Sequence, residues 1–431
     1  MTEQTSQNTA PFGLLGRKLG HSWSPQIHAR LGSVPYELHE LEPEELACFV
    51  RGGSWRGLNV TIPYKREAAQ LADEVSERVL RLGVANTLVR RPDGTIYADN
   101  SDVLGFAWML ERFCERHLGG SAPEALGARK CLVLGSGGAS QAIRAALEDA
   151  GARVVTISRT GGETYETLAE RHADAALMVN TTPVGMYPNC PATPVSREVM
   201  ARLEGLAGVL DIVYNPERTE LCLIAEELGI PSESGLAMLV GQARFSSELF
   251  QGHAIEDELL EKIEDELRSL TRNVVLIGMP GAGKTSCGKR LARMLGRPFV
   301  DIDEAIQADA GRSAAQIIQE DGEDAFRRVE TEVTASYCKR SGMVIACGGG
   351  VVTRPQNRDL LRQNGRVVLV DRPLDELSDR GRPVSQAKGV ERLAAERMHL
   401  YHEWADVILR CTGSAQSDAE LVKCVSSRPR K

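Results

Sequence analysis

A glycine-rich segment that ends in a lysine and a threonine carries the strongest chemical signal in the sequence. Residues 278–285 read GMPGAGKT and stand between the apolar stretch NVVLIG and the helical stretch SCGKRLARML. The spacing G-x-x-x-x-G-K-[ST] lets backbone N–H groups surround phosphate oxygens at a helix N-terminus. We therefore predict a nucleotide site in which Lys284 reaches the β- and γ-phosphates and the Thr285 hydroxyl ligates Mg²⁺. A glycine-rich turn without a ligand is the alternative.

Two aspartates and a glycine run follow this segment. Asp301 and Asp303 stand two apart in VDID at the end of an expected strand, so both side chains should leave the same face of the sheet. One carboxylate can hold Mg²⁺ through water while the other orients an attacking hydroxyl. The run CGGGVV (347–352) would let the backbone approach a ligand closely.

Three arginines follow the phosphate loop in the sequence and could belong to the same site. Arg327 lies in FRRVE, Arg382 in DRGRPVS and Arg397 in AERMHLY. Each arginine alone is more often a solvated surface charge. Behind a phosphate loop, they together predict a site in which Arg327 and Arg397 hold an anion while Arg382 closes over the nucleotide.

The order GxxGxGKT, DxD, FRxxE, GGG, RP and RxxLY over residues 274–410 resembles the shikimate kinase family. The resemblance implies that Lys284 and Asp303 are catalytic and that Thr285 and Asp301 serve Mg²⁺. It implies ATP contacts from Gly281, Ala282, Gly283, Lys284, Thr285, Ser286 and Arg382. It implies shikimate contacts from Asp303, Arg327, Gly348, Gly349, Gly350 and Arg397. The lid before Arg382 looks short and reads RPV rather than RPL, which bears on lid closure and ATP affinity rather than on the reaction.

A second glycine-rich turn, LGSGGAS (134–140), follows the apolar strand KCLVL and precedes a helix. Such a turn alone is weak evidence, but its flanks predict a dinucleotide site at the start of a doubly wound parallel sheet. The next expected strand ends in Ser158-Arg159-Thr160, where an NAD enzyme usually carries an acid. Because an arginine there can pair with a 2′-phosphate, we expect NADP rather than NAD.

Short polar segments precede this turn, and they read HSWSP, NVTIPYK, VANT and NSD. Their candidate residues are Ser22, Ser24, Asn59, Thr61, Lys65, Asn86 and Asp102. Taken singly, each polar residue is more often a helix cap or an Asx-turn. Lys65 and Asp102, however, could form a proton-transfer pair beside a ketone.

The order HSxSP, NVTxPxK, NTL, N[ST]D, GxGGA, an SRT strand end and GLxMLVxQA is similar to the shikimate dehydrogenase family over roughly residues 12–252. The resemblance implies that Lys65 and Asp102 are the catalytic pair. It implies shikimate contacts from Ser22, Ser24, Asn59, Thr61, Asn86, Asp102, Tyr214 and Gln242. It implies NADP contacts from Glu77, Gly135, Ser136, Gly137, Gly138, Ala139, Ser140, Ser158, Arg159, Thr160, Ile212 and Gly235. Trp23 between the two serines and Ser101 in place of threonine are mild departures.

Three α/β domains would position these residues. We expect a shikimate-binding catalytic domain over residues 11–102, a Rossmann-type NADP domain over 103–234, and a P-loop kinase domain with a central parallel sheet over 273–431. A helix within 235–270 should pack back on the first domain. Residues 253–272 are typical of a helical linker, with apolar residues at Ile255, Leu259, Ile263, Leu267 and Leu270.

Composition excludes several classes of protein. The chain has 431 residues, too many for one ordinary core, and its 42% hydrophobic content fits a soluble globular protein. A net charge of -8 argues against nucleic acid or an anionic membrane as a partner. The 10 cysteines form no CxxC pair, which favours a reduced, cytoplasmic protein. We also expect no signal peptide, because the start MTEQTSQNTAPFG is polar and lacks a cationic end followed by an apolar core. We expect no membrane span, because no apolar run is long enough.

The two resemblances describe consecutive steps of one route, the biosynthesis of chorismate and the aromatic amino acids. We therefore expect a bifunctional enzyme that reduces 3-dehydroshikimate to shikimate with NADPH and then phosphorylates shikimate with ATP and Mg²⁺. One alternative is a non-catalytic metabolite-sensing regulator of the same ancestry, against which the presence of Lys65, Lys284 and Asp303 argues. Another is a dehydrogenase that also takes quinate or uses NAD. The oligomeric state stays open.

Overall fold

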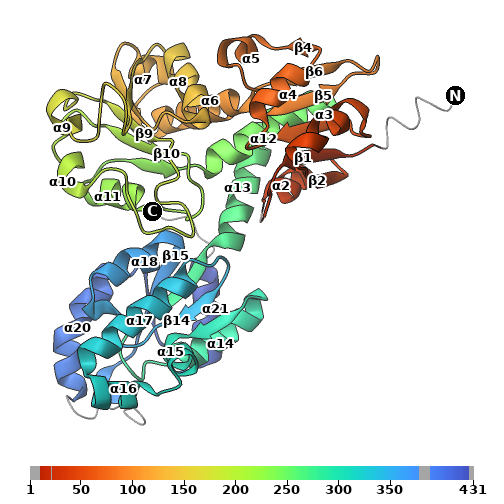
Figure 1. Cartoon of the computed structure of the whole chain (residues 1–431). Coiled ribbons are helices and arrows are strands. Elements are labelled where there is room, and N and C mark those ends of the chain that lie inside the picture. Colours follow the sequence, from red (N-terminus) through yellow and green to blue (C-terminus); the bar gives the residue numbers. More distant parts are fainter. Residues whose placement is uncertain (1–9, 21, 378–388, 427–431) are drawn as a thin grey trace. The chain divides into compact units, whose positions relative to one another are not determined.

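The computed structural model describes residues 10–20, 22–377 and 389–426 (Figure 1). The chain forms two compact units. The first comprises residues 1–183, 194–214 and 224–265, and the second comprises residues 184–193, 215–223 and 266–431. Within the described ranges, no helix is both long enough and apolar enough to cross a membrane. The predicted lid residue Arg382 lies outside the described residues.

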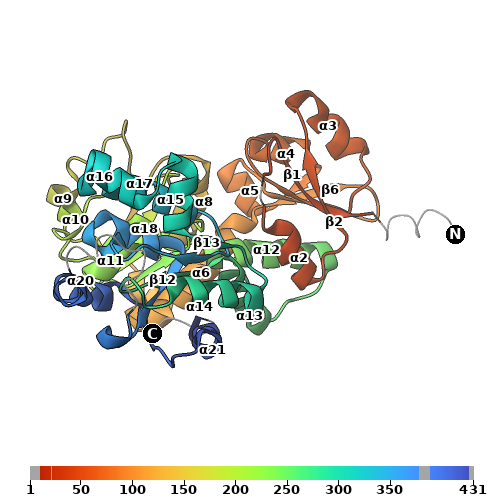
Figure 2. The ribbon, with the colours of Figure 1, turned by 90° about the horizontal axis from the view of Figure 1, so that it is seen from below.

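The first unit begins with β1 (Phe12–Gly16), α2 (Ser24–Leu31), β2 (Tyr36–Glu40), α3 (Pro43–Gly52), β3 (Gly57–Val60), α4 (Lys65–Leu71), β4 (Glu74–Val75), α5 (Glu77–Leu82), β5 (Thr87–Arg90) and β6 (Ile96–Asp99). The six strands form one mixed sheet in the order β2-β1-β3-β5-β6-β4. A core that includes Leu15, Val50 and Trp55 packs beneath α3 and α4 on one face of this sheet. The helix α2 lies on the other face (Figure 2).

Two helices that are distant in sequence, α6 (Ser101–Phe113) and α12 (Leu236–Gln251), pack tightly against each other. Glycine makes this approach possible, because a Cβ at Gly105 would lie 2.5 Å from the Gln242 backbone nitrogen. A larger residue there would push the helices apart. The packing brings the start of α6, which carries Asp102, against the part of α12 that carries Gln242. The helix α12, which lies within residues 235–270, thus packs against the start of α6.

The middle of the chain contains η1 (Cys114–Leu118), α7 (Ala122–Leu126), β7 (Lys130–Leu134), α8 (Gly138–Asp149), β8 (Arg153–Ile157), α9 (Leu168–Arg171), β9 (Leu177–Asn180), α10 (Arg197–Met200), β10 (Gly208–Asp211), α11 (Glu220–Glu227) and β11 (Ser232–Ser234). Its five strands are parallel, in the order β11-β10-β9-β7-β8. The strand order reverses at β7 and β9, which is where doubly wound sheets bind ligands. The predicted doubly wound sheet is confirmed.

The acidic helix α13 (Asp257–Thr271) follows α12. Its buried apolar residues are Leu260, Ile263 and Leu267, whereas Leu270 is 55% exposed. The prediction that Leu270 belongs to the apolar stripe was wrong, and Leu259 on that stripe is only half-buried. Leu259 and Leu260 lie four and three positions before Ile263, so either could share its face of the helix. The structure buries Leu260 rather than Leu259. Leu270 lies in the last turn, beyond this packed face.

The second unit continues with β12 (Asn273–Ile277), α14 (Lys284–Leu295), β13 (Phe299–Asp301), α15 (Ile302–Ala310), α16 (Ala314–Asp321), α17 (Glu323–Cys338), β14 (Val344–Ala346), η2 (Val351–Thr353), α18 (Gln356–Asn364), β15 (Gly365–Asp371), η3 (Leu374–Glu376), α20 (Val390–Trp404), β16 (Val407–Arg410) and α21 (Ala415–Ser426). Its five strands are all parallel, in the order β13-β14-β12-β15-β16. Apolar clusters cover both faces of this sheet. The carboxyl ends of β12, β13 and β14 meet at one edge, which brings together the phosphate loop, the aspartates and the glycine run.

Candidate active sites

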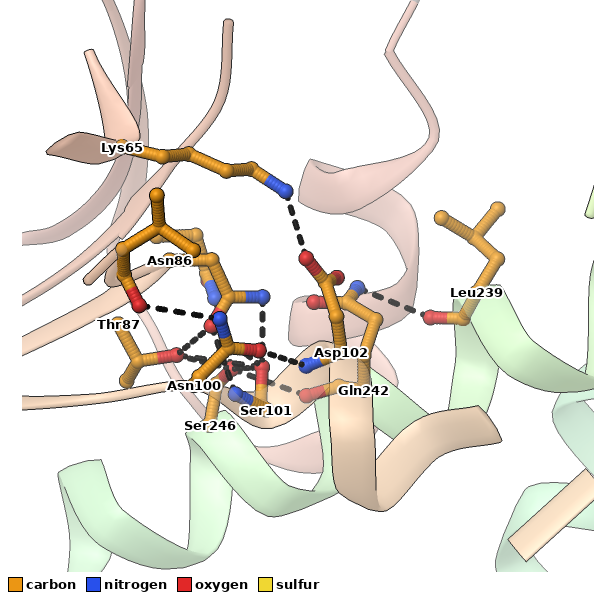
Figure 3. Close-up of polar contacts among 11 residues, drawn as sticks. Lys65, Asn86, Thr87, Asn100, Ser101, Asp102, Leu239, Gln242 and Ser246 are labelled. Carbon is orange, nitrogen blue, oxygen red and sulfur yellow. Dashed lines mark hydrogen bonds and ion pairs between the residues drawn. The ribbon is translucent and has the colours of Figure 1, made fainter. Parts of the chain in front are cut away.

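Lys65 and Asp102 form an ion pair in the first unit (Figure 3). Lys65 is the first residue of α4, and Asp102 is the second residue of α6. The Lys65 ammonium nitrogen lies 2.6 Å from Asp102 Oδ2, and the two side chains are 28% and 16% exposed. A pair that remains partly exposed can exchange a proton with a bound ligand. The structure therefore brings together the two residues that the sequence proposed for proton transfer.

Two asparagines hold the start of α6. The Asn100 side chain accepts a hydrogen bond from the Asp102 N–H at 3.1 Å and donates one to the Val84 carbonyl oxygen. The Asn86 side chain accepts one from the Ser101 N–H at 2.7 Å and donates one to the Ser101 hydroxyl at 3.0 Å. These bonds satisfy N–H groups of the first helical turn and fix the direction in which Asp102 points. Asn86 thus supports the ion pair.

A series of buried hydrogen bonds connects further predicted substrate residues. The Tyr36 hydroxyl donates to Asn59 Oδ1 at 2.8 Å, and it is also hydrogen-bonded to Ser24. Asn59 Nδ2 donates to the Ser246 hydroxyl at 2.7 Å. Burial raises the pKa of Tyr36 well above its usual value, so its phenol stays a neutral donor. Ser24 and Asn59 are therefore linked through one tyrosine.

Four other predicted substrate residues lie outside this network. The Ser22 hydroxyl accepts from the Ser24 N–H at 3.2 Å, and the Gln242 amide donates to the Leu239 carbonyl oxygen at 2.9 Å. Thr61 directly follows β3, and Tyr214 is 37% exposed. Their contact with a substrate stays a prediction.

The turn after β7 has the shape of a phosphate cradle. Gly135 has a left-handed φ of 103°, and a Cβ there would lie 2.8 Å from Thr182. Gly137 caps α8, and a Cβ at Gly137 or Gly138 would meet no atom within 4 Å. The N-terminus of α8 is therefore open to a ligand, and its N–H groups can bind a pyrophosphate. The Ser140 hydroxyl closes the turn by donating to the Gly137 carbonyl oxygen at 2.6 Å.

The end of β8 fits an NADP phosphate. Ser158 is buried, whereas Arg159 and Thr160 are exposed, and none of the three carries a negative charge that would repel a 2′-phosphate. Gly235 packs against Ile212: a Cβ at Gly235 would lie 2.1 Å from the Ile212 carbonyl oxygen, so only glycine fits.

The phosphate loop of the second unit is held open by glycines. Gly281 and Gly283 have φ angles of 89° and 97°, which favour glycine. Lys284 is the first residue of α14, and its ammonium donates to the carbonyl oxygens of Gly278 and Met279 at 2.9 and 3.0 Å. These bonds place the ammonium inside the loop, where it can bind a phosphate in place of the two carbonyl oxygens.

Thr285 and Asp301 form the pair that fits Mg²⁺. The Thr285 hydroxyl donates to Asp301 Oδ2 at 2.6 Å. Hydroxyl and carboxylate oxygens are the ligands that Mg²⁺ prefers, and nucleotide oxygens and water usually complete the set. Within the described ranges, no group of three or more His, Cys, Asp and Glu residues could hold a metal ion by itself.

The two aspartates are not on one strand face, so that expectation was wrong. The strand β13 ends at Asp301, whose side chain accepts from the N–H groups of Asp303 and Glu304 and so caps α15. Asp303 lies in the first turn of that helix. It borders a cavity of about 530 Å³ that the phosphate loop and the glycine run also line. The surrounding protein, together with the Asp301 and Glu330 carboxylates, raises the pKa of Asp303 to about 6.

Arg327 and Arg397 line the same cavity. Arg327 donates to Glu330 Oε2 at 2.7 Å, and Arg397 donates to the Gly349 carbonyl oxygen at 2.9 Å. The buried Nε atoms of both arginines have no hydrogen-bond partner among the described residues. Because each guanidinium has an N–H donor that makes no hydrogen bond, the two arginines can bind an anion such as a carboxylate. A Cβ at Gly350 would lie 1.8 Å from Arg327 Nη1, so the arginine requires glycine there.

Several residues of these sites were not predicted from the sequence. Ser246 and Tyr36 join the substrate residues of the first unit, and Tyr401 donates to the Gly349 carbonyl oxygen beside Arg397. Thr182 packs against Gly135 in the dinucleotide turn. Tyr401 lies in the RxxLY pattern, so a signal existed for it. Ser246 has none, because a serine within a helix is unremarkable in sequence.

Family models match both parts of the chain. The model described as the shikimate dehydrogenase substrate binding domain matches residues 14–88, and the model of shikimate kinase matches residues 280–426. The shikimate dehydrogenase (NADP(+)) of Clostridium perfringens is 35% identical over 283 residues, which span 60% of this chain and 98% of the relative. The shikimate kinase of Symbiobacterium thermophilum is 49% identical over 110 residues, 26% of this chain and 63% of the relative.

A solved structure agrees with these matches. The shikimate 5-dehydrogenase of Thermus thermophilus, in complex with NADP(H) and shikimate, superposes with a TM-score of 0.50 at 27% identity. The match covers 60% of this chain and 99% of that structure.

Proposed function

Because the chain belongs to the shikimate dehydrogenase family and carries a shikimate kinase domain behind it, we propose that it converts 3-dehydroshikimate to shikimate 3-phosphate in two consecutive reactions. The first is reduction to shikimate with NADPH, and the second is phosphorylation of shikimate with ATP. The expected pairing of an NADP-dependent dehydrogenase with a kinase is confirmed. This pairing carries the proposal, because the product of one domain is the substrate of the other.

In the first reaction, Lys65 is the proton donor. When bound along the open N-terminus of α8, NADPH supplies a hydride. Lys65 gives a proton to the ketone oxygen of the substrate as negative charge develops there. Asp102, which is 2.6 Å from the ammonium, holds Lys65 in position and accepts a hydrogen bond from the new hydroxyl. Asn59, held by Tyr36 and Ser246, contacts the substrate from the sheet.

In the second reaction, Asp303 is the base. Its raised pKa of about 6 keeps it ionised near pH 7 while making it a better proton acceptor than an ordinary aspartate. Lys284 moves from the loop carbonyls to the phosphates and neutralises their charge. Arg327 and Arg397 hold the carboxylate of shikimate. Thr285 and Asp301 would hold Mg²⁺, which would add positive charge at the phosphates.

Each part of the chain has its own role in this proposal. Residues 11–102, together with α12, hold the substrate of the first reaction, and residues 103–234 hold NADP. Residues 273–431 form the kinase, with Arg382 acting from its lid. The protein works in the cytoplasm, in keeping with its ten cysteines, all of which are free thiols.

One preparation of the full chain tests both activities separately. NADPH consumption with 3-dehydroshikimate reports the first, and ADP production with shikimate reports the second. Lys65→Ala should abolish only the first activity and Lys284→Ala only the second, so each variant is the control for the other. Absence of either activity in the wild-type protein would refute the corresponding half of the proposal.

A further inference from the structure

We propose that Ser246 is a positioning residue of the dehydrogenase, whose hydroxyl fixes both the Asn59 amide and the start of α6 for turnover. The inference rests on the proposed function, because it takes Asn59, Lys65 and Asp102 to surround shikimate. Ser246 itself lies beneath that site and touches neither the substrate nor the cofactor in this proposal.

The Ser246 hydroxyl joins four segments of the first unit (Figure 3). Ser246 lies on α12 and is 0% exposed. Its oxygen is 2.7 Å from Asn59 Nδ2 on β3, 3.0 Å from the Ser101 hydroxyl on α6 and 3.1 Å from the Thr87 hydroxyl on β5. It also donates to the Gln242 carbonyl oxygen, one turn earlier on α12, at 2.9 Å. One buried atom therefore links the sheet to α6 and α12, two of the helices that carry proposed active-site residues.

Counting donors and acceptors narrows the orientation of this hydroxyl. A serine hydroxyl has one donor and two acceptor positions. Asn59 Nδ2 can only donate, so one lone pair of Ser246 faces Asn59. The Gln242 carbonyl oxygen can only accept the Ser246 proton, whereas the hydroxyls of Ser101 and Thr87 can each donate to Ser246 or accept from it. Four polar groups therefore surround three hydrogen-bonding positions, so the Ser246 hydroxyl keeps a partner at each position.

The consequence for Asn59 is a fixed amide. Its Nδ2 donates to Ser246, and its Oδ1 accepts from the Tyr36 hydroxyl, so a flip of the amide would break both bonds. One Nδ2 hydrogen remains for a ligand. Without the Ser246 hydroxyl, this buried N–H loses its partner, and only the Tyr36 bond still opposes a flip of the amide.

Through α6, Ser246 also affects the Lys65–Asp102 pair. Ser101 contacts Ser246 through its hydroxyl and Asn86 through both its N–H and its hydroxyl. The next residue is Asp102, the partner of Lys65. A shift of Ser101 would therefore change the direction of the Asp102 carboxylate, on which turnover depends.

Ser246→Ala in the full chain tests the inference. We expect the KM for shikimate to rise about tenfold, because the hydrogen bond to Asn59 is lost. We expect kcat to fall by a similar factor, because the hydrogen bond to Ser101 at the start of α6 is lost as well. The KM for NADP⁺ and the kinase activity of the same protein should stay within about twofold of wild type. Ser246→Thr, which keeps the hydroxyl, should restore most of the activity. In an Asn59→Ala background, Ser246→Ala should raise the KM for shikimate much less.

Ser247→Ala is the matched control. Ser247 is the next residue of α12, is also 0% exposed, and bonds the Ser33 hydroxyl at 2.7 Å and His28 Nδ1 at 3.0 Å. Its loss should lower thermal stability while leaving the KM for shikimate within about twofold of wild type. If the Ser246→Ala protein does not fold, Ser246→Cys, which keeps the volume but weakens the hydrogen bonds, enters the same comparison.

The inference is overturned if Ser246→Ala leaves kcat and KM unchanged, matches Ser247→Ala, or adds in full to Asn59→Ala. These outcomes differ from failure of the proposed function, in which the wild-type protein would not oxidise shikimate with NADP⁺ at all.

Discussion

The Lys65 ammonium lies 2.6 Å from the Asp102 carboxylate, although 37 positions separate the two residues in sequence. Each residue sits in the first turn of a helix, α4 or α6, so the backbone fixes where both side chains begin. Because the pair stays partly exposed, it can serve a bound ketone rather than only stabilise the fold. The proposed dehydrogenase mechanism depends on this arrangement.

Replacing Lys65 should damage turnover far more than binding. We expect Lys65→Ala to lower kcat for shikimate oxidation by roughly 10²–10⁴-fold, the usual contribution of a general acid–base group, while KM changes about threefold or less. Steady-state kinetics measure both values. The control is Lys130→Ala, which removes a lysine paired with Asp174 at the start of β7 and should keep wild-type kcat. Equal losses in kcat and in affinity would contradict the role of Lys65.

Arg159 should decide between the two dinucleotides. Its charge is the one cationic group of Ser158-Arg159-Thr160, where the 2′-phosphate of NADP would lie. Arg159→Ala should raise the KM for NADP⁺ by about tenfold or more and leave the KM for NAD⁺ nearly unchanged. Rates with both cofactors provide the measurement, and quinate as an added substrate tests the breadth of the dehydrogenase. An equal rise in the KM for NAD⁺ would show that Arg159 does not bind the 2′-phosphate.

Asp303 should be required for phosphoryl transfer but not for the binding of shikimate. Asp303→Asn keeps the shape of the side chain and removes its basicity, so we expect kcat of the kinase to fall about 10²–10⁴-fold. Binding of shikimate, measured by calorimetry, should change little because Arg327 and Arg397 remain. Asp309→Asn, an exposed change on the same helix α15, is the control. A kinase that keeps its kcat without the Asp303 carboxylate would require another base.

His28 should make the first unit less stable in acid. It is fully buried, stacked on Tyr36 with ring centroids 4.2 Å apart, and burial lowers its pKa from 6.5 to about 3. Between these values the unfolded chain binds a proton that the folded chain does not. The free energy of unfolding therefore falls as the pH drops below 6.5, by up to about 1.4 kcal/mol per pH unit from this residue.

Calorimetric unfolding between pH 5 and pH 7 measures this effect. His28→Asn should flatten the dependence of the first unit's transition temperature on pH, whereas the exposed change His253→Asn should keep the wild-type slope. Identical slopes for wild type and His28→Asn would show that His28 does not govern acid stability.

The phosphate loop was predictable because its chemistry is local. The glycines with left-handed φ angles, Lys284 and Thr285 fall within one turn and the start of one helix, so spacing alone specifies them. The relation between Asp301 and Asp303 was misjudged because β13 stops at Asp301, which caps the next helix. Sequence alternation describes a strand only as far as the strand continues.

The supporting network of the dehydrogenase site could not be predicted. Ser246 meets Asn59 across 187 positions of sequence, and only the packing of α12 against α6 and the sheet creates that contact. Leu270 shows the same limit for burial, since a helical stripe indicates which face packs but not where the packing ends.

A coupled assay tests most directly that one polypeptide catalyses both reactions in sequence. The full chain is given 3-dehydroshikimate, NADPH, ATP and Mg²⁺, and the phosphorylated product is quantified against NADPH consumed. We predict about one shikimate 3-phosphate for each NADPH oxidised once both reactions have run to completion. Accumulation of free shikimate without consumption of ATP would contradict the proposal that the chain catalyses both reactions.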